Sequence, residues 1–205
     1  DTYVWHTIHE QNMRHRLTEA LCGYHEKYPY RYGMKKAEIH MTYMKKVKLN
    51  VFDLYVEMLS EEGALKRHQE FLQLPEFEVR KDAVYEKVLK TVQKQFEKVQ
   101  FDFQRFSEIS FGNIKREEVE DIMLLLIDED IVVKITEDIY TLKSIIEKAK
   151  EVIQNRLKEN PLITIAEVRD LLGTSRKSAK PILEYMDSIK VTKKNGTESE
   201  RVAYV

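Results

Sequence analysis

The apolar positions of this chain switch repeatedly from helical spacing to short runs typical of strands, and the same order recurs three times. Three segments can be stacked on one another: YVEMLSEEGALKR (55–67), IMLLLIDEDIVVKI (122–135) and ILEYMDSIKVTKK (182–194). Each contains an apolar helix end, a small acidic or serine-containing turn and an apolar strand. The stacking makes Leu65, Val133 and Val191 equivalent and predicts an internal structural repeat.

A second β-run follows each of these strands after a polar turn, as expected for a hairpin. The three second runs are FLQLP (71–75), IYTLK (139–143) and RVAYV (201–205). Two helices followed by a hairpin wing form the plan of a winged helix. We therefore predict a mainly α protein with small β-hairpins, built from three tandem winged-helix units at 1–77, 78–143 and 144–205. The first unit could include a remnant of a preceding domain.

Composition restricts the class of protein but does not identify a partner. The 205 residues include 34 Lys and Arg against 35 Asp and Glu, a net charge of −1. No apolar run approaches the roughly 20 residues of a membrane span, and there is no signal-peptide pattern, so no membrane partner is expected. The single cysteine suits a reducing, cytoplasmic compartment. We also expect a monomer. The chain begins at Asp1 rather than Met, and we expect a fragment of a longer protein.

Charge is distributed unevenly over the three predicted units. Residues 1–75 carry a net charge of +1, residues 76–144 carry −5 and residues 145–205 carry +3. This asymmetry matters more than the overall charge, because the last unit alone favours an anionic partner. The middle unit is expected to be unsuited to binding phosphate.

The positive charge of the last unit lies first at the start of a predicted helix. Gly173 ends one helix, and Thr174 or Ser175 is expected to cap the next. Arg176, Lys177 and Lys180 then fall on the first turns of that helix, where cations oppose the helix dipole unless an anion is bound. These residues are candidates for contact with a phosphate or a base edge.

A second group of cations lies on the hairpin of the same unit. Lys193 and Lys194 occupy its first strand, and Arg201 returns on its second strand. We expect the helix start and the hairpin to form one concave basic surface. Cations at such positions are also common on solvated surfaces, and winged helices bind proteins as well as nucleic acids.

The run ITIAEVRDLLGTSRKSAKPILEYMDSIKVTKKNG (163–196) resembles the last winged-helix domain of the bacterial selenocysteine-specific elongation factor family, SelB. The resemblance rests on the Gly-x-Ser-Arg-Lys helix start, the Leu-Glu-Tyr-x-Asp helix end and a Thr followed by two basic residues in the wing. It extends to YHEKYPYRYGMKKAEIH (24–40) and HQEFLQLP (68–75). The wing differs from the family's short turn, because Thr197–Glu200 make it longer and more acidic.

The resemblance implies a non-catalytic arm whose last domain binds the mRNA hairpin that recodes UGA as selenocysteine. By position, Ser175, Arg176 and Lys177 match the RNA-contacting helix start, and Lys193 and Lys194 match the basic wing. The resemblance implies that the GTPase, which binds GTP and magnesium, belongs to the complete factor. The same holds for its partners, selenocysteinyl-tRNA and the ribosome. Two alternatives remain open: a winged-helix DNA-binding regulator and a winged-helix protein-interaction scaffold.

Other patterns of reactive residues give weaker indications. His6, His9, His15 and His25 lack the accompanying Cys or carboxylate at metal-ligand spacing, so no metal site is expected. No Gly-x-x-x-x-Gly-Lys-Ser/Thr run is present, and no catalytic residue or cofactor is predicted for this chain. Cys22 is expected to be a buried thiol.

Overall fold

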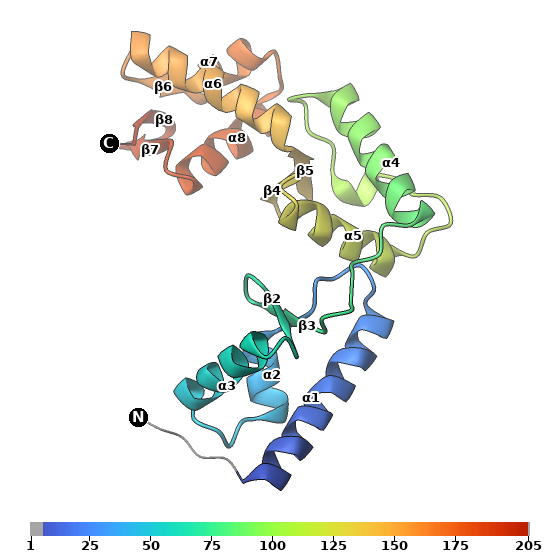
Figure 1. The fold of residues 1–205 in the computed structure, drawn as a ribbon. Coiled ribbons are helices and arrows are strands. Elements are labelled where there is room, and N and C mark those ends of the chain that lie inside the picture. The colour runs from blue at the N-terminus through green and yellow to red at the C-terminus, as the bar shows by residue number, and fades with distance from the viewer. Residues whose placement is uncertain (1–5, 205) are drawn as a thin grey trace. The chain divides into compact units, whose positions relative to one another are not determined.

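The structure is a computed structural model that describes residues 6–204. The chain divides into two compact bodies, which we call the N-terminal module (up to Asp82) and the C-terminal module (from Ala83). Figure 1 shows the order of the helices and strands within each module. Each module is described by itself.

The N-terminal module is one winged helix. Its elements are α1 (Thr7–Lys27), β1 (Met34–Lys35), α2 (Lys36–Tyr43), α3 (Leu49–Glu61), β2 (Lys66–His68) and β3 (Phe71–Gln73). The strands form an antiparallel sheet in the order β1-β3-β2. Phe52, Tyr55 and Leu59 of α3 pack against Leu21 of α1 and Leu72 of β3, which seals the core between helices and sheet.

A close backbone approach joins the loop after α1 to the sheet of the N-terminal module. A Cβ atom added at Gly33 would lie 2.1 Å from the carbonyl oxygen of Leu72, well inside van der Waals contact. Leu72 pairs with Met34 across β1 and β3, so the glycine allows the two strands to meet. Any larger residue at position 33 would push these strands apart.

The C-terminal module contains two helix-and-hairpin units in succession. The first comprises α4 (Ala83–Val99), the short 3-10 helix η1 (Phe106–Glu108), α5 (Arg116–Asp128), β4 (Val132–Thr136) and β5 (Ile139–Leu142). The second comprises α6 (Lys143–Glu159), β6 (Ile163–Thr164), α7 (Ile165–Leu172), α8 (Arg176–Ser188), β7 (Thr192–Asn195) and β8 (Thr197–Ala203). The fold class predicted from the sequence, tandem winged helices of mainly α content, is confirmed.

The two units of the C-terminal module share apolar packing. The core of the last unit is formed by α6, α7 and α8, and Val133 of β4 belongs to the same buried cluster. Phe101, Phe103 and Ile135, all from the preceding unit, pack against this cluster. Because apolar side chains of both units exclude water from one another, the last unit is built onto its predecessor. The three-way division at 77/78 and 143/144 stays a prediction.

The internal repeat is visible in the way that three helices end. Gly63, Asp130 and Lys190 follow α3, α5 and α8 with positive φ angles of 71°, 58° and 58°. The next residue in each case donates its backbone N–H to a carbonyl five residues earlier: Ala64 to Leu59, Ile131 to Leu126 and Val191 to Met186. This is the Schellman ending, which turns the chain from helix into strand.

These hydrogen bonds correct the stacking made from the sequence. Ala64, Ile131 and Val191 are the equivalent residues, so the alignment of Leu65 and Val133 with Val191 is wrong by one and two positions. Apolar residues fill several consecutive positions at each strand start, and periodicity alone could not fix the register there. None of the helices within residues 6–204 is long and apolar enough to cross a lipid bilayer.

Candidate nucleic-acid interface

The loop between α7 and α8 presents two cations to solvent. α7 ends at Gly173, whose φ of 60° turns the chain, and Ser175 precedes the first residue of α8. Arg176 and Lys177 are exposed, and neither side chain forms a hydrogen bond or ion pair with the described residues. The next two residues, Ser178 and Ala179, are buried. Only the first turn of α8 therefore offers free cations to a ligand.

The other side of this loop is anchored to residues that precede it by more than 70 positions. The Thr174 hydroxyl donates to the Phe101 carbonyl oxygen at 2.6 Å, and the Phe103 N–H donates to Ser178 Oγ at 2.9 Å. Hydrogen bonding from Ser175, with weaker bonds from Ser178 and Thr174, lowers the pKa of the Asp102 carboxyl.

Ser175 lies at this loop contact, and its side chain does not cap α8. The pKa of Asp102 is lowered chiefly by hydrogen bonding from Ser175, so a negative charge lies beside the helix start. Contact of Ser175 with RNA stays a prediction. Nothing in the sequence marked Asp102, because the contact spans 73 positions and follows no motif.

The cations farther along α8 and on the hairpin are exposed but partly neutralised. Lys180 Nζ lies 3.7 Å from Glu184 of the same helix, and Lys194 Nζ lies 2.7 Å from Glu198 across the wing. The hydrogen bond from Lys194 lowers the pKa of Glu198. Lys193 lies over the ring of Tyr204, with Nζ 5.8 Å from the centroid. Among the hairpin cations, Lys193 thus has no carboxylate partner among the described residues.

Arg201 was expected on this basic surface, and that expectation is wrong. Its side chain is 1% exposed, and Nε donates to Asp187 Oδ2 at 2.6 Å. Nη1 donates to the carbonyl oxygens of Glu198 and Glu200 at 2.9 and 3.0 Å. The other Asp187 oxygen accepts from Thr192 at 2.7 Å. Arg201 ties the wing to the end of α8 and cannot reach RNA without breaking this network.

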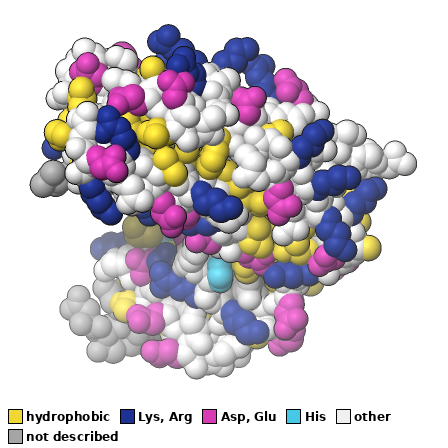
Figure 2. Space-filling view, turned by 90° about the horizontal axis from the view of Figure 1, so that it is seen from above, with side chains coloured by type: hydrophobic (Ala, Val, Ile, Leu, Met, Phe, Trp, Pro, Cys, Tyr) yellow, Lys and Arg dark blue, Asp and Glu magenta, His cyan; other side chains and the backbone are white. Residues whose placement is uncertain are grey.

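Cations do not form a continuous patch among the side chains visible in Figure 2. Figure 2 shows Lys and Arg side chains interspersed with Asp and Glu on the face seen from above, with hydrophobic side chains between them. This mixture agrees with the net charge of −1. Any electrostatic recognition must therefore depend on local groups of unpaired cations rather than on the field of the whole chain.

Other candidate chemistry is limited. No group of three or more His, Cys, Asp and Glu side chains within residues 6–204 is arranged to hold a metal ion. Cys22 is exposed, so the buried thiol expected from the sequence is wrong: the apolar stripe of α1 passes through Leu17 and Leu21 and leaves position 22 outside it.

Comparison with known families agrees with the resemblance stated above. Two family models, both described as elongation factor SelB, winged helix, match residues 18–74 and 155–199. The selenocysteine-specific elongation factor of Desulfomicrobium baculatum is 24% identical over 185 residues, which cover 89% of this chain and 29% of that protein. The chain thus spans less than a third of this relative, and the two segments that match family models are winged helices.

Two solved structures share the fold. The mRNA-binding domain of elongation factor SelB from E. coli, solved in complex with SECIS RNA, aligns with a TM-score of 0.51 and 19% identity. It covers 61% of this chain and 100% of its own. A bacterial selenocysteine-specific elongation factor EF-Sec aligns with a TM-score of 0.50 and 19% identity over 95% of this chain and 29% of its own.

Proposed function

Since this chain belongs to the winged-helix region of the SelB elongation factor family, we propose that it is the arm that binds an mRNA hairpin. The hairpin would be the selenocysteine insertion element, and binding it would tether the factor to a UGA codon that is recoded as selenocysteine. The mRNA-binding domain of E. coli SelB, which has the same fold, was solved with SECIS RNA. This likeness supports the choice of ligand.

The observation that carries the proposal is the pair of unpartnered cations at the start of α8. Arg176 presents a planar guanidinium that can make two parallel hydrogen bonds to a phosphate or to a guanine edge. Lys177 and Lys193 act as point charges on phosphates. Lys180 and Lys194, which pair with Glu184 and Glu198, must exchange these partners for RNA and contribute less.

The burial of α8 favours a hairpin over a DNA groove. A recognition helix that lies in a major groove presents a row of polar side chains along its length. Here Ala179, Ile182, Leu183 and Met186 are each 0% exposed, so the middle of α8 belongs to the core. Contact restricted to one helix end suits the unstacked bases of an RNA loop.

The remaining expectations concern the complete factor. We propose that GTP and magnesium are bound outside this chain, and that selenocysteinyl-tRNA and the ribosome are partners of the full-length protein. A monomeric factor working in the cytoplasm is consistent with this role.

A binding experiment with the SECIS hairpin of the E. coli complex and a loop-mutated hairpin tests the proposal. Arg176→Ala should cost about 1–3 kcal/mol of binding free energy and reduce the discrimination between the two RNAs. Arg176→Lys should recover little, because the fork geometry is lost. Lys193→Ala should lower the affinity for both RNAs alike. It should also reduce the salt slope, the dependence of log affinity on log salt concentration, by about one phosphate contact.

Lys148→Ala, at an exposed α6 lysine without a partner among the described residues, is the matched control and should change neither affinity nor slope. Tighter binding to duplex DNA than to either hairpin would favour the DNA-binding regulator. Absence of salt-dependent binding to all three would favour the protein scaffold and refute the proposal.

A further inference from the structure

A stripe of lysines runs along α4, the first helix of the net-acidic middle unit. Lys87, Lys94 and Lys98 are seven and four residues apart, so at 100° per residue they project within about 40° of one another. All three are exposed. Tyr85, Val88, Val92 and Phe96, which are buried, occupy the opposite side of the helix. The stripe therefore lies on the exposed side of α4.

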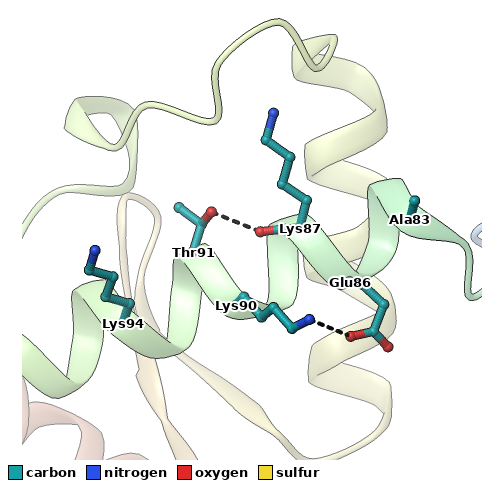
Figure 3. Close-up of a pocket in the computed structure, with 6 residues that line it drawn as sticks. All are labelled: Ala83, Glu86, Lys87, Lys90, Thr91 and Lys94. Atoms are coloured by element: carbon teal, nitrogen blue, oxygen red, sulfur yellow. Dashed lines mark hydrogen bonds and ion pairs between the residues drawn. The ribbon is translucent and has the colours of Figure 1, made fainter.

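These lysines lack the acidic partners that usually accompany surface cations. Lys90, on the flank of the stripe, lies 3.9 Å from Glu86. Lys87, Lys94 and Lys98 form no ion pair with the described residues. Figure 3 shows Lys87 and Lys94 extending from the same side of α4, whereas Lys90 turns towards Glu86. Like charges at positions 94 and 98 repel across one helical turn, so the arrangement destabilises the helix unless an anion is bound.

The stripe leads towards the proposed RNA-binding end of α8. Lys98 precedes Phe101 by three residues, so their Cα atoms are at most about 11 Å apart. The Phe101 carbonyl oxygen accepts the hydrogen bond from Thr174, two residues before Arg176. From Lys87 to Lys98 the helix rises about 16 Å. Asp102 follows Lys98 by four positions and contributes a negative charge beside the start of α8.

We propose that Lys87, Lys94 and Lys98 bind the phosphate backbone of double-stranded RNA, namely the stem of the hairpin whose loop is bound at α8. This inference rests on the proposed function and extends it to the middle unit. The net charge of that unit, −5, had led us to expect that it would not bind phosphate. The local arrangement of charge outweighs the total, because the acidic residues of that unit lie mainly outside α4.

The residue types indicate what part of the RNA is contacted. Lysine carries a compact charge on a flexible stem and lacks the planar fork that reads base edges. Three lysines spread over about 16 Å can follow a run of phosphates but cannot specify a sequence. The stripe therefore contributes affinity and orientation, and discrimination between hairpins is left to Arg176.

The test uses the full chain and two RNAs: a blunt duplex of about 20 base pairs, and the same stem closed by the SECIS loop. The triple variant Lys87→Gln/Lys94→Gln/Lys98→Gln keeps good helix formers on an exposed face and should fold as the parent does, which circular dichroism checks. It should lower the affinity for both RNAs about tenfold or more at 50 mM salt, and lower the salt slope by about 2–3. Discrimination against a mutated loop should be unchanged.

The matched control is Lys45→Gln/Lys46→Gln/Lys48→Gln, which removes three exposed lysines without partners among the described residues from the N-terminal module. The control should leave duplex affinity within twofold. Equal losses in both triple variants, or unchanged duplex affinity and slope in the α4 variant, would overturn the inference. Arg176→Ala distinguishes loop recognition at α8 from stem binding at α4. It should lower the affinity for the hairpin and leave the affinity for the duplex unchanged, so either hypothesis can fail without the other.

Discussion

Replacing Arg201 by methionine would show whether this arginine is structural or binds RNA. The substitution removes the guanidinium but keeps an unbranched side chain of similar length, so little cavity should form. It leaves Asp187, whose side chain is 21% exposed, without its 2.6 Å partner. It also removes the donors to two backbone carbonyls of the wing, those of Glu198 and Glu200.

The expected loss of stability follows from this burial. Removing one partner of a buried ion pair costs about 3–5 kcal/mol, because the remaining charge is desolvated and unpaired. Asp187 keeps its hydrogen bond from Thr192 and some contact with water, so the lower end, about 3 kcal/mol, is expected. At about 2 cal/mol/K of unfolding entropy per residue, this lowers the melting temperature of the C-terminal module by roughly 10 °C.

Urea and thermal unfolding of the full chain, followed by circular dichroism, measure this loss. Hairpin affinity is then compared below the melting transition, where Arg201→Met should lie within about threefold of the parent. The double variant Arg201→Met/Asp187→Leu should recover part of the stability, because no unpaired charge remains. A variant with nearly full stability and a tenfold weaker hairpin affinity would refute the structural role and return Arg201 to the RNA-binding surface.

Three further predictions concern the scaffold. Gly33→Val should destabilise the N-terminal module by about 2–3 kcal/mol in a urea melt, because its Cβ would meet the Leu72 carbonyl, and hairpin affinity should be unchanged at a temperature where the module is folded. Burial lowers the pKa of His25 to about 4, whereas in the unfolded chain it is about 6.5. Above pH 6.5 the ring is neutral in both states, and up to about 2–3 kcal/mol of folding stability should be lost as the pH falls from 6.5 to 4. His25→Phe, which can stack on Phe77 as the histidine does, should make stability depend less on pH between 4 and 6.5. An unchanged pH dependence would mean that other groups cause it. Lys190→Gly should stabilise the C-terminal module by about 0.5–1 kcal/mol, since a non-glycine residue there holds φ at 58°, and a loss of stability would contradict the Schellman assignment.

Much of the fold follows from local signals in the sequence. The spacing of Ile145, Ile146, Ala149, Ile153 and Leu157 predicts one buried face of a helix, and all five residues are buried in α6. Turn residues such as Gly173 and Gly196 mark the helix end and the hairpin, where both adopt positive φ. The exposed cations Arg176 and Lys177 were also identifiable, because a helix start is read from a few neighbouring residues.

The tertiary structure decided which charges are available and which are already used. Arg201 and Lys194 are both basic wing residues, yet one is buried against Asp187 and the other is exposed beside Glu198. Pairings such as that of Asp102 with the start of α8 join residues more than 70 positions apart, and no local pattern encodes them. The sequence by itself determined the repeated winged helices and the resemblance to the SelB family, because periodicity and motifs are local. The partners of each cation depend on how the chain folds back on itself.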